Sequence, residues 1–180
     1  MRTTNLCMSG ADVTYVERID WGEDPQSLLA RLTAEIPWRQ ESIVLWGRRV
    51  LQPRLISWHG DPGARYRYSG LSLEPSPWTP GLAAIRERIE SRLGTRFNSV
   101  LANLYRDQRD SMGLHSDDEP ELGLRPLIAS VSFGAERGFV FRPRRPLEAA
   151  PVRLRLASGS LLVMGGDTQR CWRHALPKQT

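Results

Sequence analysis

The last third of the chain decides its fold, and within it residues 127–133 read LIASVSF. Apolar residues occupy every second position from Leu127 to Phe133, whereas Ser130 and Ser132 lie between them, a pattern typical of a strand with one buried face. Similar short runs follow, separated by turns that contain Gly or Pro: residues 139–141 read FVF, residues 152–156 read VRLRL and residues 160–164 read SLLVM. Short strands punctuated in this way predict a β-sandwich or a barrel.

Two amphipathic helices are predicted before these strands. The first begins at Asp24–Pro25, where Asp can cap the helix and Pro suits its first turn, and it ends before Pro37. The second begins at Thr79–Pro80 and ends at Gly94, a residue favoured just after a helix. Because helices come first and strands follow, we predict an α+β fold in which N-terminal helices buttress a β-sandwich. No internal repeat or low-complexity linker divides the chain, so we predict a single domain over residues 1–180.

The composition is that of an ordinary globular protein, with 40% hydrophobic and 25% charged residues, and it excludes the disordered and fibrous classes. Lys and Arg total 25 against 20 for Asp and Glu, and only one of these basic residues is a lysine, Lys178. The planar guanidinium of arginine suits phosphate, so nucleic acid is a plausible partner. A GC-rich genome, which encodes basic residues mainly as arginine, explains the bias equally well.

Three absences in the sequence predict an intracellular protein. No stretch has the roughly 18 apolar residues that a membrane span needs, and residues 1–10 lack the pattern of a signal peptide. The two cysteines, Cys7 and Cys171, cannot form a disulfide framework, which fits a reducing compartment. We therefore expect no membrane association and, if the source is a bacterium, a cytoplasmic location.

Two histidines and an aspartate form the candidate metal site. His115 and Asp117 are two residues apart, so their side chains leave the same face of an extended backbone. His174 lies at the end of the last strand-like segment. If the sandwich brings these strand ends together, the three residues form the facial triad of non-haem Fe(II) oxygenases. Zinc-dependent hydrolysis is the alternative chemistry for the same ligands, and it would use Glu119 as the base.

Two further residues with metal-binding side chains are not expected to join this group. His59 lies in a Trp-His-Gly-Asp sequence that we interpret as a surface turn. Cys171 precedes His174 by three residues, so on a strand its side chain faces the opposite way.

A series of motifs surrounds the candidate ligands and extends from about residue 44 to about residue 177. In order, they are PR at 53–54, GDPG at 60–63, YRYSGL at 66–71, NSVLANLY at 98–105, GLHSDDE at 113–119, PLIASVSFG at 126–134, FVFR at 139–142, GSLLVM at 159–164 and HALP at 174–177. This ordered series closely resembles the AlkB family, and in particular its subgroup that repairs duplex DNA.

The resemblance implies an Fe(II)- and 2-oxoglutarate-dependent dioxygenase that consumes O₂ and removes alkyl groups from nucleobases. It also implies a double-stranded β-helix, or jelly roll, with a core at about residues 97–180 and lid hairpins at about residues 42–72. The iron ligands would be the three residues already named, and the side chains of Asn103 and Tyr105 would hydrogen-bond 2-oxoglutarate. The expected role is direct-reversal repair of 1-methyladenine and 3-methylcytosine in single- or double-stranded DNA by a monomeric enzyme. The alternatives are an oxygenase acting on RNA or a non-nucleic substrate, and a non-catalytic DNA-binding protein.

The resemblance further implies how a flipped-out base would be held. Tyr66 and Tyr68 match the family's lid hairpin, where Tyr68 would stack on the base, and Ser69 would contact the nucleotide. Asp118 and Glu119 would favour the positive charge of the methylated ring, or they are solvated carboxylates of a turn.

The duplex itself is expected to contact an apolar hairpin tip and the arginines that flank the two hairpins. Leu45, Trp46 and Gly47 match the tip that enters the base stack in place of the flipped base, although Trp46 is also compatible with an ordinary core position. The arginines expected to bind phosphate are Arg48, Arg49, Arg54, Arg65, Arg67, Arg142, Arg144 and Arg145.

The sequence departs from the family at its C-terminal end. The family has a further strand after the distal histidine with two arginines, one of which binds the far carboxylate of 2-oxoglutarate. This chain stops at Thr180, and no arginine follows Arg173. We expect either a truncated chain or a shortened homologue, and in the second case a weaker affinity for 2-oxoglutarate.

Overall fold

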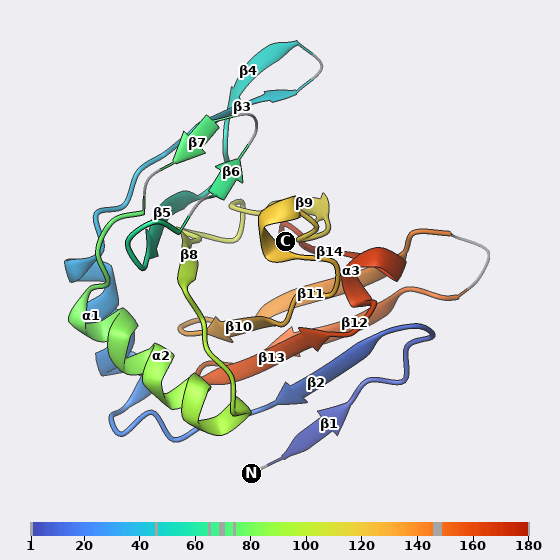
Figure 1. Ribbon diagram of the computed structural model, residues 1–180, viewed down its shortest axis with the longest axis horizontal. Helices are drawn as coiled ribbons and strands as arrows, with labels where there is room; N and C mark the ends of the chain where they lie inside the picture. The colour runs from blue at the N-terminus through green and yellow to red at the C-terminus, as the bar shows by residue number, and fades with distance from the viewer. Residues whose placement is uncertain are drawn as a thin grey trace. The chain divides into compact units, whose positions relative to one another are not determined.

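The computed structural model describes residues 2–45, 47–64, 66–68, 71–73, 75–145 and 149–179 (Figure 1). The chain forms two units, one made of Met1–Leu29 with Ser111–Thr180 and the other of Ala30–Asp110. Helices and several antiparallel sheets occur together, which confirms the α+β prediction. None of the helices in the described ranges combines the length and apolar character that a membrane-spanning helix needs.

The first unit contains two four-stranded antiparallel sheets. Their strand orders are β1-β2-β13-β10 and β12-β11-β14-β9, so the chain changes sheet repeatedly between β9 and β14. The elements are β1 (Thr3–Asn5), β2 (Asp12–Val16), β9 (Met112–His115), a short 3-10 helix η1 (Pro120–Leu122), β10 (Ile128–Ser132), β11 (Arg137–Pro143), β12 (Val152–Leu156), β13 (Ser160–Gly165), α3 (Thr168–Cys171) and β14 (Trp172–Leu176).

The core of this unit draws on both sheets. Leu161 and Leu162 of β13 and Phe141 of β11 are fully buried. Adjacent residues of β13 are buried, so both faces of this inner strand are covered, and the continuous apolar run that starts at Leu161 is typical of such a strand. The alternating run at residues 127–133 also forms a strand, β10, which is one residue shorter at each end.

The second unit contains three antiparallel strand pairs and a helix. The strand pairs are β3 (Ser42–Leu45) with β4 (Arg48–Leu51), β5 (Leu55–Gly60) with β8 (Ser99–Leu104), and β6 (Tyr66–Tyr68) with β7 (Leu71–Leu73); the helix is α2 (Pro80–Leu93). A further helix, α1 (Pro25–Glu35), begins in the first unit and continues into the second.

Both predicted helices are confirmed, together with the residues that limit them. The Asp24 carboxylate accepts hydrogen bonds from the backbone N–H groups of Gln26 and Ser27 at 3.0 and 3.1 Å, so it caps α1. The Thr79 hydroxyl accepts from the N–H of Leu82 at 3.3 Å and caps α2, which ends at Gly94 with φ 64°. These caps are local, which is why the sequence predicts them well.

The interpretation of His59 as a surface-turn residue is wrong. His59 lies in β5 and is 1% exposed, because the segment around Ser76 returns alongside this strand and forms a bridge with it. Its Nδ1 lies 2.7 Å from the carbonyl oxygen of Pro77, which can only accept, so Nδ1–H donates. Its Nε2 then accepts from the Ser57 hydroxyl at 2.9 Å, and both ring nitrogens are satisfied within the unit.

Candidate metal centre

Strand pairing in the first unit brings the three predicted metal ligands together. His115 ends β9, and His174 lies directly opposite it in β14. Asp117 follows His115 by two residues. One ligand atom from each of the three side chains lies within 4.8 Å of the others, so the chain forms the cluster that the His-x-Asp spacing and the distant histidine predicted.

The side-chain geometry directs both imidazoles at the carboxylate. His115 Nε2 lies 3.4 Å from Asp117 Oδ1, and His174 Nε2 lies 3.5 Å from Asp117 Oδ2. The two imidazole rings meet edge to face, with centroids 4.3 Å apart. The three donor atoms therefore surround one small volume.

Hydrogen bonding and packing fix the two imidazoles. His115 Nδ1 lies 2.9 Å from the carbonyl oxygen of Gly113 and donates to it, which leaves the lone pair of Nε2 for a metal ion. The ring of His174 stacks on Phe139, with centroids 5.4 Å apart and an interplanar angle of 20°, and it meets the edge of Phe141 at 6.1 Å. This apolar packing restricts the orientation of His174 and keeps water away from its outer side.

The protonation states also suit metal binding. Burial lowers the pKa of His174 to about 4, a shift that the Asp117 carboxylate opposes and the His115 ring assists. Burial pushes the pKa of Asp117 upward. When the imidazoles are protonated, however, Nε2–H of His115 can donate to the carboxylate and both rings attract it, and these effects outweigh burial, so the pKa of Asp117 lies below its usual value. At neutral pH His174 is therefore a neutral imidazole and Asp117 a carboxylate, the forms that bind metal ions.

Two residues that the sequence did not single out hold the loop that carries Asp117. The buried side chain of Gln169, in α3, accepts a hydrogen bond from the Asp117 backbone N–H at 3.0 Å, and its Nε2 contacts Met164 Sδ at 3.7 Å. The Ser116 hydroxyl donates to the carbonyl oxygen of Trp172 at 2.9 Å. Nothing in the sequence marks these residues beyond the nearness of Gln169 to His174 and of Ser116 to both upstream ligands.

The donor set fits a ferrous ion. Two neutral imidazole nitrogens and one carboxylate oxygen on one side of a site are the ligands that non-haem Fe(II) oxygenases use, with the remaining coordination positions left to other molecules. Both imidazoles present Nε2 to the carboxylate, and His115 is oriented through its other ring nitrogen, as is common for metal-bound histidine.

Asn103 and Tyr105, expected to bind 2-oxoglutarate, belong to the second unit. Asn103 lies in β8, and Tyr105 follows that strand directly. The Asn103 amide donates to the carbonyl oxygen of Leu101 at 3.2 Å and accepts from Arg54 Nε at 2.8 Å. Arg54 is only 4% exposed, so the expectation that it contacts phosphate at the surface is wrong: its guanidinium is oriented within the unit by Asn103.

Asp118 and Glu119 follow the metal ligands directly in the sequence. Asp118 is exposed and forms an ion pair with Arg144, which lies just after β11. Glu119 is half-buried at the start of η1. Two of the residues assigned from the resemblance, one to the base and one to phosphate, therefore contact each other in the first unit.

The hairpin β3–β4 presents apolar and basic side chains to solvent. Val44 and Leu51 are 62% and 60% exposed, and Arg48 and Arg49 are exposed next to the turn at Gly47, where φ is 76°. The side chain of Leu45 and the residue Trp46 lie outside the described parts of the chain, as do Arg65, Ser69 and the side chains of Tyr66, Arg67 and Tyr68. Of the later arginines, Arg142 and Arg145 are exposed.

Comparison with known proteins identifies the family. A family model described as "2OG-Fe(II) oxygenase superfamily" matches residues 16–180. The chain is 41% identical over 172 residues to "Alpha-ketoglutarate-dependent dioxygenase alkB homolog 3" of Homo sapiens, and this alignment covers 91% of the chain and 57% of the relative. It is 47% identical over 143 residues to "DNA oxidative demethylase ALKBH2" of Bos taurus, and this alignment covers 75% of the chain and 51% of the relative. The chain thus spans about half the length of the curated relatives it matches.

A solved structure, that of OsALKBH1, shares the fold with a TM-score of 0.62 and 17% sequence identity over 92% of this chain and 85% of that one. This likeness supports the fold alone, whereas the sequence matches carry the family assignment. Together with the His-Asp-His cluster, they show that the chain belongs to the 2OG-Fe(II) oxygenase superfamily and, within it, to the AlkB family.

Proposed function

We propose that the protein is an Fe(II)- and 2-oxoglutarate-dependent dioxygenase that removes N-alkyl groups from DNA bases, with 1-methyladenine and 3-methylcytosine as substrates. The observation that carries this proposal is the cluster of His115, Asp117 and His174, whose two Nε2 atoms lie 3.4 and 3.5 Å from the carboxylate. The name of the Bos taurus relative, a DNA oxidative demethylase, supports the choice of substrate. The net charge of +5 is in keeping with a nucleic-acid partner.

The three clustered side chains would hold the iron, and the rest of the site would position the reactants. When bound together with 2-oxoglutarate and O₂, Fe(II) supplies the oxidation of the N-methyl carbon, which leaves as formaldehyde. Phe139 keeps His174 in a neutral, dry environment. Asn103 and Tyr105 would hydrogen-bond 2-oxoglutarate.

The substrate base would have to leave the duplex, because base pairing and stacking enclose the atoms at which an enzyme acting on a base must react. In this proposal Tyr66, Tyr68 and Ser69 hold the extruded nucleotide. Asp118 and Glu119 offer carboxylates to the positively charged ring. Binding of the substrate would then have to compete with Arg144 for Asp118.

The β3–β4 hairpin would contact the duplex. Its exposed Val44 and Leu51 lie near exposed Arg48 and Arg49, and such a combination of apolar and cationic side chains suits contact with base steps and phosphates. Leu45, Trp46 and Gly47 at the tip would fill the space left by the extruded base. Arg65, Arg67, Arg142 and Arg145 remain further candidates for phosphate contacts.

We further propose that the two four-stranded sheets of the first unit form a double-stranded β-helix, with a core at about residues 97–180, N-terminal helices against it and recognition hairpins at about residues 42–72. The chain would act as one intracellular, monomeric dioxygenase domain. Size-exclusion chromatography with light scattering tests the monomer, and a stable dimer would exclude it.

Formaldehyde release tests the function directly. The protein is incubated with Fe(II), ascorbate, 2-oxoglutarate and an oligonucleotide that carries 1-methyladenine or 3-methylcytosine, in single-stranded DNA, duplex DNA and RNA in separate reactions. We expect one formaldehyde per repaired base and none from the Asp117→Ala variant. Activity that needs neither metal nor 2-oxoglutarate would exclude the proposal. If only the RNA oligonucleotide is demethylated, the substrate would be RNA and not DNA.

A further inference from the structure

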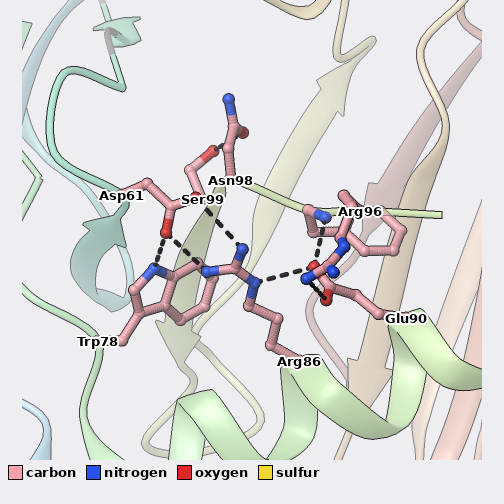
Figure 2. Close-up of polar contacts among 8 residues, drawn as sticks. Asp61, Trp78, Arg86, Glu90, Arg96, Asn98 and Ser99 are labelled. Atoms are coloured by element: carbon pink, nitrogen blue, oxygen red, sulfur yellow. Dashed lines mark hydrogen bonds and ion pairs between the residues drawn. The ribbon is translucent and has the colours of Figure 1, made fainter.

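A polar cluster in the second unit joins helix α2 to both ends of the segment that contains the β6–β7 hairpin (Figure 2). Arg86 of α2 donates to both carboxylate oxygens of Asp61, from Nη1 at 2.6 Å and from Nη2 at 3.2 Å. Trp78 Nε1 donates to the same Oδ1 of Asp61 at 2.9 Å. Asp61 lies five residues before β6 and Trp78 five residues after β7, so one carboxylate connects the two ends of the segment.

The Arg86 side chain is held on its other sides as well. Its Nε donates to Glu90 Oε1 at 2.9 Å, and its guanidinium lies 4.7 Å from the centroid of the Trp78 ring. Glu90 also accepts from the backbone N–H of Phe97 at 2.7 Å. A planar guanidinium can make a two-pronged bond to a carboxylate and stack on an aromatic ring at once, whereas a lysine ammonium cannot.

The charges of the cluster match these contacts. Hydrogen bonds from Arg86 and then from Trp78 lower the pKa of Asp61, against the effect of burial. Hydrogen bonds to Asp61 and then to Glu90 raise the pKa of Arg86. Both partners therefore carry full charge over the whole range in which the protein would be assayed.

The backbone closes the base of the same segment. Gly60 N–H donates to the carbonyl oxygen of Ser76, and Ser76 N–H donates to that of Trp58, both at 3.0 Å. Asp61 N–H donates to the carbonyl oxygen of Asn98 at 2.7 Å, in the run that leads into β8. A Cβ atom at Gly60 would lie 2.9 Å from this Asn98 oxygen, so the close approach requires glycine.

We propose that Arg86 is a positioning residue for substrate recognition: its contacts with Asp61 and Trp78 fix the orientation of the β6–β7 hairpin relative to α2. The inference rests on the proposed function, because it assigns a role to a hairpin that would hold the nucleotide. It adds that α2, which carries none of the residues assigned to metal, co-substrate or base, determines how that hairpin is oriented.

A purely structural ion pair would have a different signature. It would stabilise the whole fold, so its loss would accelerate amide exchange in every unit and would lower the amount of active enzyme rather than the apparent affinity for substrate. A positioning residue acts on one segment and on the KM for the substrate that this segment holds.

The test compares Arg86→Gln with Arg86→Lys and with Arg92→Gln, a control that removes one positive charge from an exposed position in the last turn of the same helix. Hydrogen–deuterium exchange is followed by mass spectrometry over residues 62–77 and over β13. The KM and kcat for a methylated oligonucleotide are measured with the same proteins, together with the substrate-free consumption of 2-oxoglutarate.

We expect Arg86→Gln to accelerate exchange in residues 62–77 and to raise the oligonucleotide KM about tenfold or more, since a small displacement of a positioning group has effects of this size. The kcat, the exchange of β13 and the substrate-free consumption of 2-oxoglutarate should stay within about twofold, because a locally acting contact leaves the rest of the fold unchanged. Arg86→Lys should recover part of the KM, and Arg92→Gln should resemble the unaltered protein.

Unchanged exchange in residues 62–77, or equal acceleration there and in β13, would overturn the positioning role. An unchanged KM with a loss of active enzyme would also overturn it. The exchange experiment does not depend on turnover, so it decides the role of Arg86 even if the unaltered protein releases no formaldehyde. The Asp117→Ala variant should lose turnover and keep the exchange of residues 62–77, which separates the two proposals.

Discussion

Gln169 connects α3 to the backbone of a metal ligand, and its replacement tests how far the triad depends on this support. The substitution Gln169→Met keeps the approximate length of the side chain and removes both of its polar atoms. Because Gln169 is 3% exposed, the Asp117 N–H that donates to it at 3.0 Å would lose its partner in a dry environment. An N–H group left unsatisfied in this way costs about 1–3 kcal/mol.

The expected effect on metal affinity follows from that range. If the loss appears as a carboxylate that is less well oriented, 1–3 kcal/mol corresponds to roughly 5- to 150-fold weaker binding. Mutation of residues that hydrogen-bond to metal ligands typically weakens metal affinity about 10- to 100-fold, which lies in the same range. We therefore expect Gln169→Met to bind Mn(II), used as a redox-stable probe for Fe(II), about tenfold or more weakly.

Calorimetric titration of Mn(II) into the metal-free protein measures this directly, with the free ion followed by electron paramagnetic resonance. The control is Arg170→Met, which introduces the same methionine side chain at the next residue of the same helix, where the side chain is exposed. Thermal unfolding shows whether the variants remain folded. A folded Gln169→Met protein with an unchanged Mn(II) affinity would refute the idea that this amide orients Asp117.

Three other predictions concern stability. In the unfolded chain His174 is protonated near pH 6.5, whereas the buried side chain is protonated only near pH 4, so the free energy of unfolding of the metal-free protein should fall by up to about 3 kcal/mol between these pH values. Urea unfolding should show a shallower pH dependence of this free energy for His174→Leu. The same pH dependence in both proteins would contradict the assignment. Asp110→Asn should lower the free energy of unfolding by about 1–2 kcal/mol, because the buried carboxylate accepts hydrogen bonds from the backbone N–H, Nε and Nη2 of Arg106. Denaturant titration measures the change, and a value under about 0.5 kcal/mol would show that water replaces these hydrogen bonds. Gly94→Ala should cost about 1 kcal/mol because φ is 64° after α2, and an unchanged melting temperature would show that the helix end adjusts without strain.

The sequence predicts those features whose causes lie within a few residues. The limits of α1 and α2 follow from Asp24, Thr79 and Gly94, each of which acts on its own helix. The alternation at residues 127–133 predicts β10 for the same reason. The His-x-Asp spacing places two ligands on one face, but it needs His174 from another strand to become a site.

Features that depend on distant pairing were harder to predict. His59 is buried because the segment around Ser76 returns to β5, and Arg54 is buried with its Nε on Asn103, 49 residues away. Local sequence around either residue carries no sign of these partners. The role of Gln169 was missed for the same reason, since its contact with Asp117 spans 52 residues.

The metal centre itself depends on one such distant feature, the register between β9 and β14. Side chains on a strand alternate between its two faces, so a slip of one residue would exchange His174 for Ala175 opposite His115. Packing opposes this slip, because Trp172, His174 and Leu176 share one face of β14 and all three are buried. A slip would move the buried side chains of Trp172, His174 and Leu176 out of their present contacts, including the stack of His174 on Phe139. The apolar residues that flank His174 therefore do more than complete the core: they select the register in which two imidazoles and a carboxylate can share one metal ion.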